Sequence, residues 1–288
     1  MTQLQDSVSG QGGLAAVAPT LCLPVKALTK QTIVIRLLLL VLVVTTVYAF
    51  TTLDYGEVDL PKAVLDTLSN LRIIFLHPGG PRLSFAKALY EVVITLGLAF
   101  LTTLFGGGIA LFLGLLGAQN LAPIWVTNVV KAFVAVIRAV PTILWVLIFA
   151  VTAGLGATAA VVGMTFHSIS YLTKAYAESF EDLDRSVIEA LKASGANWWQ
   201  IVFQAVIPSS STYLLSWTFM RFEINFANAV AMGAAAGASG VGFDLFMASG
   251  YYFDLREVGL ITYIILAFAI ALETVATRMK SRIKDYQA

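Results

Sequence analysis

Charge is scarce in this sequence, and the scarcity excludes an ordinary water-soluble fold. Only 12% of the 288 residues are charged and 58% are hydrophobic, whereas a typical soluble domain carries about 25% charged residues. The 18 basic and 17 acidic residues nearly cancel, so a nucleic-acid-binding surface is not indicated. Apolar runs of helix-spanning length predict an all-α integral membrane protein.

Residues that hold metals and nucleotides are also few. A single cysteine, Cys22, excludes an intrachain disulfide and a cysteine metal cluster. His77 is the only histidine besides His167, so we expect no metal site and interpret His167 as a hydrogen-bonded packing residue. The sequence contains no Gly-Lys-Ser/Thr phosphate loop. We therefore expect this chain to bind no cofactor: if ATP drives it, ATP and Mg bind to another subunit. The sequence offers no nucleophile motif and no carboxylate pair in a defined pocket, so a membrane enzyme is not indicated.

The apolar runs predict about six transmembrane helices. A flexible tail over 1–30 precedes a first helix over 31–53, for which a cleaved signal peptide is the alternative. A polar loop over 54–85, with one short surface helix as an option, is followed by a helical core over 86–280 and a tail over 281–288. Within the core we expect helices over 86–116, 124–153, 157–180, a stretch after Pro208, and 258–278, the second of them kinked at Pro141.

Basic residues gather at both ends of the predicted bundle. Lys26, Lys30 and Arg36 flank the first helix, and basic residues at 278, 280, 282 and 284 follow the last. The positive-inside rule then places both termini and the charged 181–208 segment in the cytoplasm. The 54–85 loop falls outside.

Residues 189–208 form the most distinctive segment of the chain. A short helical piece leads to Gly195, which permits a sharp turn, and a second amphipathic piece ends at Pro208. Between them lies a bulky apolar group that we expect on the membrane or in a partner's cleft: Trp198, Trp199, Ile201, Val202 and Phe203. An amphipathic interfacial helix without a partner is the alternative.

This segment resembles the cytoplasmic coupling motif of ABC-importer permeases. The residues that carry the resemblance are Glu189, Ala190, Gly195, Ile207 and Pro208, while Leu191 stands where the family has a second alanine. Over 85–280 the chain is similar to the phosphonate-importer branch, although Ser239 replaces a glycine and no basic residue stands near Asn228. The matching stretches are 138–141, His167 with Lys174 and Glu178, 221–225, 237–243 and 254–257.

The resemblance implies a fold, partners and a cargo. It implies the type I importer fold of methionine permeases with one extra N-terminal helix, in a bacterial inner membrane. The partners implied are a second permease copy, as a homodimer or a paired homologue, two ATPase subunits that dock on the 181–208 loop, and an extracytoplasmic binding protein that delivers phosphonate or a related oxyanion. An ion-coupled secondary transporter or channel is the alternative, but the two halves show no inverted repeat.

Polar residues inside the predicted spans are candidates for a translocation pathway. An arginine at mid-depth, such as Arg221, costs about 2.5–3.5 kcal/mol on insertion scales. Arg221, Asn225 and Asn228 share one helix face, while Glu223 points about 200° away. We predict that these four residues line an anion pathway. Alternatively, Arg221 and Glu223 pair with charges such as Glu91 or Arg138.

Two further sets complete the candidates. His167, Tyr171, Lys174 and Glu178 share a face of their helix, and we expect Lys174 and Glu178 to form an internal pair. Gly237, Gly240 and Gly242 are gate candidates, or sites of close helix packing. Their spacing is not a nucleotide fingerprint, because it follows a predicted membrane helix rather than a strand.

Overall fold

The computed structural model describes residues 30–53 and 59–285, and these residues form helices and connecting turns without a strand. The chain divides into two units, with the boundary between Leu60 and Pro61. Cys22, Lys26 and the rest of the predicted N-terminal tail up to residue 29 lie outside the described residues. The first unit contains α1 (Lys30–Thr52), which confirms the predicted first helix; none of its residues is buried.

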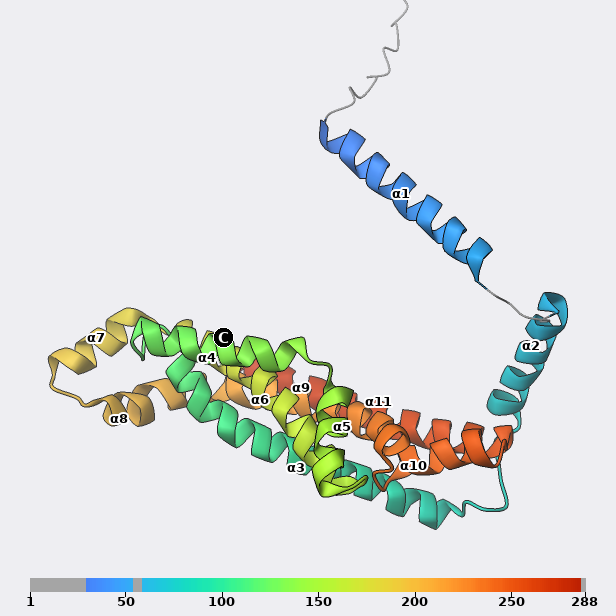
Figure 1. Ribbon diagram of the computed structural model, residues 1–288. Helices are drawn as coiled ribbons and strands as arrows, with labels where there is room; N and C mark the ends of the chain where they lie inside the picture. Colours follow the sequence, from blue (N-terminus) through green and yellow to red (C-terminus); the bar gives the residue numbers. More distant parts are fainter. Residues whose placement is uncertain (1–29, 54–58, 286–288) are drawn as a thin grey trace, which may run out of the picture. The chain divides into compact units, whose positions relative to one another are not determined.

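The second unit holds the remaining helices (Figure 1). In chain order they are α2 (Leu60–Leu76), α3 (Phe85–Gly117), α4 (Ile124–Ala139), α5 (Thr142–Ala153), α6 (Ala157–Glu181), α7 (Arg185–Ala193), α8 (Trp198–Ile201), α9 (Ile207–Ala236), α10 (Val241–Phe246) and α11 (Leu255–Asp285). π-Helical turns lie at Val202–Val206 and Met247–Tyr251. Because α11 continues to Asp285, most of the predicted C-terminal tail is helical.

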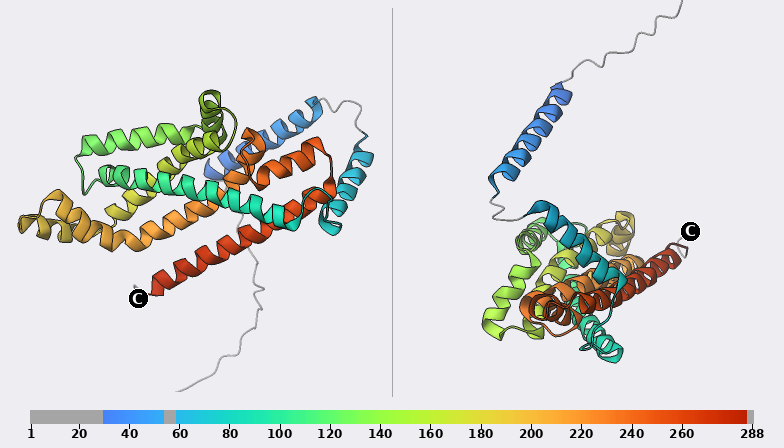
Figure 2. Two further views of the ribbon diagram at one scale, coloured as in Figure 1. Left: turned by 90° about the horizontal axis from the view of Figure 1, so that it is seen from below. Right: turned by 90° about the vertical axis from the view of Figure 1, so that its right-hand side faces the viewer.

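Helix α6 lies at the centre of the second unit. It contacts α3, α4, α5 and α9, and α3, α6 and α9 run lengthwise beside one another (Figures 1 and 2). Small residues permit this packing: a Cβ added to Gly106 of α3 would stand 2.6 Å from the Cβ of Ser168, and one added to Gly163 would stand 2.5 Å from the backbone of Val146. Fifteen of the 25 residues of α6 are buried, so this helix does not need the apolar exterior of a lipid-facing span.

The fold class predicted from the sequence is confirmed. Among the described residues, three helices are long and apolar enough to cross a membrane: α1, α3 and residues 255–278 of α11. The number rises to five if the bent pairs α4–α5 and 198–236 with 241–251 each count as one span. The sixth predicted span is α6, in which the small polar residues Thr165, Ser168, Ser170, Thr173 and Ser179 are buried.

The predicted helix over 124–153 is two helices rather than one kinked helix. α4 and α5 meet at 86°. Pro141 is the N-cap of α5, and Val140 before it is extended, with φ −92° and ψ 122°. A proline disfavours the helical conformation in the residue that precedes it, so the helix ends completely at this point.

Pro208 does not stop the helix, contrary to the sequence prediction. Helical backbone continues from Trp198 through the π turn and α9 to Ala236. In the π turn the Ile207 N–H donates to the Val202 carbonyl. The wider turn just before Pro208 accommodates the proline, which lacks an N–H and would clash with the preceding turn of a regular α-helix.

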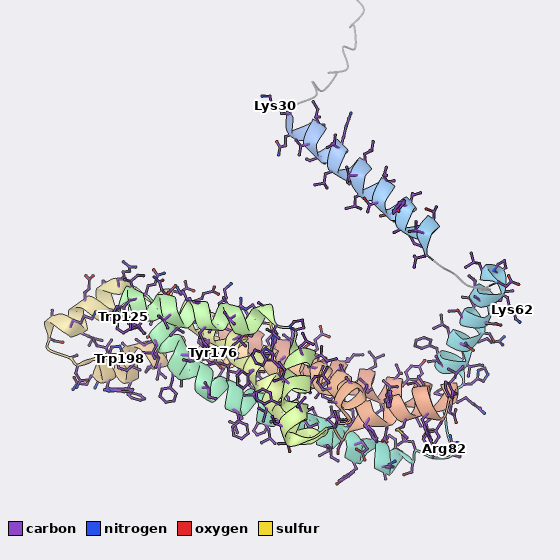
Figure 3. All side chains as sticks on the ribbon, viewed as in Figure 1. Lys30, Lys62, Arg82, Trp125, Tyr176 and Trp198 are labelled. Carbon is purple, nitrogen blue, oxygen red and sulfur yellow. The ribbon has the colours of Figure 1, made fainter. Side chains whose placement is uncertain are left out.

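The predicted 54–85 loop is mostly helix, because α2 occupies 17 of its residues. The end of α2 packs on α11: Tyr263 Oη donates to the Phe75 carbonyl at 2.7 Å, and a Cβ on Gly259 would meet the Ile74 carbonyl oxygen. Arg82 forms ion pairs with Asp254 at 3.5 Å and Glu257 at 3.7 Å. These contacts fix the connection between α2 and α3 at one end of the unit, opposite Trp198 (Figure 3).

Candidate coupling site and polar core

The elbow, defined here as α7, α8 and the residues between and after them up to Pro208, is built around Gly195. The Gly195 N–H donates to the Lys192 carbonyl and the Ala196 N–H to the Leu191 carbonyl, both at 3.0 Å. This pair of bonds is a Schellman motif, whose key residue needs a left-handed backbone; Gly195 has φ +86°. The predicted glycine turn is confirmed. The next helix starts at a capping box between Asn197 and Gln200.

The elbow begins at an aspartate cap. Asp184 Oδ1 accepts a hydrogen bond from the Ser186 N–H at 2.9 Å. This bond favours the carboxylate and lowers the pKa of Asp184 below its ordinary value. The cap is therefore charged at neutral pH and is lost only as the pH falls through this lowered pKa.

The elbow is anchored to the helix bundle by its inner face. Ile188, Ile201 and Val202 are 3%, 3% and 0% exposed and join one core cluster with residues of α3 and α6. Trp198 Nε1 donates to the Leu121 carbonyl at 3.0 Å. The prediction that Ile201 and Val202 belong to an exposed apolar group is therefore wrong, because the second helix of the motif turns this face toward its own bundle.

The outer face of the elbow remains open. Glu189 and Ala190 are exposed, and Trp199 and Phe203, stacked at 6.0 Å, are 53% and 62% exposed. Pro208 is exposed and Ile207 half-buried. A hollow of about 220 Å³ beside Glu189 is lined by Gln119, Asn120, Arg185, Ile188 and Lys192 as well. The open surface presents both charge and aromatic area, which suits a protein partner.

The adjacent tryptophans give a matched pair of variants. Trp198→Phe removes the indole N–H that holds the elbow to Leu121, and we expect it to destabilise the chain by about 1 kcal/mol and to weaken coupling. Trp199→Phe removes no such bond within the described contacts and serves as the control. Thermal unfolding in detergent checks this, and equal melting temperatures for the two variants would contradict the anchoring role.

A second set of polar residues forms a buried cluster between α3, α6 and α9. Arg221, Asn225 and Ser168 are 2%, 0% and 0% exposed. Arg221 Nε donates to Ser168 Oγ at 3.1 Å, and Asn225 Nδ2 contacts Ser168 Oγ at 3.0 Å and Thr103 Oγ1 at 2.9 Å. The Arg221 guanidinium also lies over the Tyr171 ring at 5.2 Å. One of its nitrogens, Nη2, is buried without a hydrogen-bond partner.

The four predicted pathway residues differ in burial. Arg221 and Asn225 lie in the core of the unit, whereas Asn228 and Glu223 are half-buried. In the part of the chain that the structure describes, neither Arg221 nor Glu223 forms an ion pair with Glu91 or Arg138, so the alternative of bracing ion pairs finds no support. The pathway role of the four residues stays a prediction.

The polar face of α6 is arranged largely as expected. Lys174 Nζ lies 3.5 Å from Glu178 Oε1, which confirms the predicted pair. His167 Nδ1 is buried but has no hydrogen-bond partner. His167 is therefore packed as expected, but without the expected hydrogen bond at this nitrogen. No group of three His, Cys, Asp or Glu side chains that could hold a metal ion occurs in the described ranges.

Of the three candidate gate glycines, Gly237 and Gly240 lie in the turn between α9 and α10, and Gly242 lies at the start of α10. Gly237 ends α9 with φ +63°, and Gly240 has φ +114°. A Cβ on Gly240 would meet Thr95 Oγ1, and one on Gly242 would meet the Val230 carbonyl oxygen. Close packing thus requires glycine at positions 240 and 242 whether or not the turn moves, and the gate assignment stays a prediction.

Sequence reasoning missed Thr103 and Ser168, the partners of Arg221 and Asn225. Both are small hydroxyl residues in apolar surroundings, where their side chains also bond their own helix, to the Ala99 and Met164 carbonyls. Such residues are common in membrane helices and carry little signal by themselves. The signal that was available is Gly106, whose position brings α3 against Ser168.

Residues 110–284 match the model of the family described as "Binding-protein-dependent transport system inner membrane component". The chain belongs to this family. This permease is 29% identical over 193 residues to the phosphate-import permease protein PhnE of Mycolicibacterium smegmatis, covering 66% of this chain and 35% of that one. It is also 29% identical to the phosphite transport system permease protein PtxC of Stutzerimonas stutzeri, covering 67% and 70%.

Solved structures confirm the fold of the permease. The inward-facing MetNI methionine ABC transporter matches with a TM-score of 0.61 at 20% identity, over 69% of this chain and 95% of that one. An amino acid ABC transporter matches with a TM-score of 0.57 at 16% identity, over 76% and 97%. The type I importer fold and the multi-pass membrane character expected from the sequence are therefore confirmed.

Proposed function

We propose that this permease is the membrane-spanning subunit of an ATP-driven importer that carries phosphonate or a related oxyanion. A separate binding protein delivers the anion, and separate ATPase subunits, which hold ATP and Mg, dock on the 189–208 motif. The assembly contains a second permease copy, either identical or homologous. Both termini and the elbow lie on the cytoplasmic side, as the basic residues at the chain ends favour.

The observation that carries this proposal is the open outer face of the elbow. Its inner face is fixed to the bundle through Trp198 and the buried Ile188, while Glu189 and Ala190 of α7 remain exposed. A surface that is rigidly attached to membrane helices and exposed on its other side can pass force from a soluble motor to the bundle. Two relatives are named as a phosphate-import permease and a phosphite transport system permease, and these names favour an oxyanion as the cargo.

ATP-driven uptake in liposomes tests the proposal. The permease is reconstituted with a candidate ATPase and a candidate binding protein, and uptake of labelled methylphosphonate, phosphite and phosphate is measured. We expect Glu189→Lys to lower uptake at least about 10-fold, because a reversed charge at a docking surface costs about 2 kcal/mol or more. Asp66→Lys, an equal charge change on exposed α2, is the control and keeps wild-type uptake.

Two results would contradict the proposal. Full uptake and substrate-stimulated ATP hydrolysis in Glu189→Lys would show that the motif does not couple the subunits. Uptake by the permease alone, driven by an ion gradient without ATP, would favour the alternative of a secondary transporter.

A further inference from the structure

A groove of about 320 Å³ runs between α4 and α6 at the end of the bundle next to the elbow. Gly117 of α3 belongs to its lining, and buried Val130 and Val134 contribute apolar lining. Its polar lining comes from Lys131 and Arg138 of α4 and from Thr173, Lys174, Glu178 and Glu181 of α6. None of these residues belongs to the coupling motif or to the Arg221 cluster.

The groove has an excess of positive charge. Three cations, Lys131, Arg138 and Lys174, face two carboxylates. Lys131 pairs with Glu181 at 3.1 Å and Lys174 with Glu178 at 3.5 Å. Arg138 instead donates from Nη2 to the Ser170 carbonyl at 3.2 Å, and it forms no ion pair among the described residues. A guanidinium with five N–H donors therefore keeps donors for a further anion.

A buried hydroxyl in the same lining points independently to a ligand. Thr173 is 2% exposed, and its Oγ1 has no hydrogen-bond partner. A buried polar group left unsatisfied costs about 1–3 kcal/mol, so such groups in native proteins are usually partnered. Thr173 lies three residues after Ser170, on the same face of α6. The free hydroxyl and the carbonyl that positions Arg138 are thus neighbours.

The exposure of these charged side chains limits which surroundings this face of the bundle can have. Lys131 and Lys174 are 45% and 55% exposed on helices that pack in an otherwise apolar bundle, and charged side chains facing hydrocarbon are costly. This face must therefore meet water, protein or lipid headgroups. A tetrahedral oxyanion satisfies the groove directly, because it accepts bidentate bonds from an arginine and one from a hydroxyl.

We propose that this groove binds a tetrahedral phosphorus oxyanion, held by Arg138, Thr173 and Lys174. The transported anion and the phosphate of an anionic lipid headgroup share this chemistry. Where the anion is the cargo, the proposal rests on the proposed function and adds a site on its route.

Binding to the purified full-length permease tests the proposal without partners. Methylphosphonate and inorganic phosphate are titrated by calorimetry in detergent, and retention of phosphatidylglycerol against phosphatidylcholine is measured by native mass spectrometry from nanodiscs. We expect binding to weaken about 10-fold to 100-fold in Arg138→Gln and about 10-fold in Thr173→Val. Lys62→Gln on exposed α2 removes a cation elsewhere and leaves binding unchanged.

The binding measurements distinguish a free anion from a lipid headgroup as the ligand of the groove. Loss of methylphosphonate or phosphate binding in both groove variants identifies the free anion as the ligand, and loss of phosphatidylglycerol retention alone identifies the lipid. Thr173→Val removes a hydroxyl without a partner, so the fold is kept even if Arg138→Gln fails to assemble. No binding to the wild type, or equal binding by wild type and variants, overturns the groove site. If the groove site is overturned but ATP-driven uptake is observed, the proposed function still holds. If the groove binds the anion but ATP-driven uptake is not observed, only the proposed function is overturned.

Discussion

Gly195→Val is expected to lower ATP-driven uptake to less than about a tenth of wild type while leaving membrane insertion unchanged. Gly195 has φ +86°, a left-handed conformation that costs an L-residue about 1–2 kcal/mol and a β-branched residue more. An added Cβ would meet no atom within 4 Å, so the damage comes from the backbone alone. The elbow would then lose the turn that presents Glu189, and uptake in liposomes measures the loss.

Gly195→Asn separates backbone conformation from the mere presence of a side chain. Asparagine tolerates the left-handed region far better than valine, so we expect uptake to return to at least about half of wild type. Equal losses in the asparagine and valine variants would show that bulk at this exposed position, and not the turn, disturbs the partner. Equal yields of all three proteins in detergent confirm that the bundle is intact.

Arg221→Met is expected to lower uptake at least about 10-fold without lowering stability. Arg221 is 2% exposed, makes one side-chain hydrogen bond, to Ser168, and leaves Nη2 without a partner. A buried cation without a carboxylate is costly, so an apolar side chain of similar length should be tolerated or even stabilising. The loss in uptake follows from electrostatics: Arg221 and Arg138 both contact residues 168–171 of α6, and together they make this depth favourable for an anion.

Uptake and thermal stability are measured together for this variant. Arg221→Lys keeps the charge and should retain more uptake than the methionine variant. A lower melting temperature with unchanged specific uptake would mean that Arg221 only holds the core. Restored uptake in an Arg221→Met, Glu223→Gln double variant would reveal an ion pair that forms in another conformation.

Helix positions followed well from the sequence because long uncharged runs have one explanation in a membrane protein. The helix expected over 86–116 is found at Phe85–Gly117, and that over 157–180 at Ala157–Glu181. The two prolines were harder to interpret. Pro141 ends a helix and Pro208 does not, and the difference depends on whether the preceding turn can widen, which the residue type does not reveal.

The candidate site was predictable where a local backbone rule applies and not where a tertiary contact decides. Gly195 could be assigned because a turn between two helices needs its backbone freedom. Ile201 and Val202 could not be separated from Trp199 and Phe203, because which face of a short helix meets the bundle depends on α3 and α6. The groove residue Thr173 had no local signal, because only the packing of α4 against α6 leaves its hydroxyl without a partner.

The unbroken helical stretch past Pro208 makes the elbow and the glycine turn two ends of one rod. From Trp198 to Ala236 the rod is about 58 Å long, and a tilt of about 5° at one end moves the other by about 5 Å. A docked ATPase that tilts the elbow by a small angle would therefore displace the far end of this helix by several ångströms. That end adjoins residues 237–242, where Gly240 packs against Thr95 and Gly242 against Val230 without space for a Cβ atom.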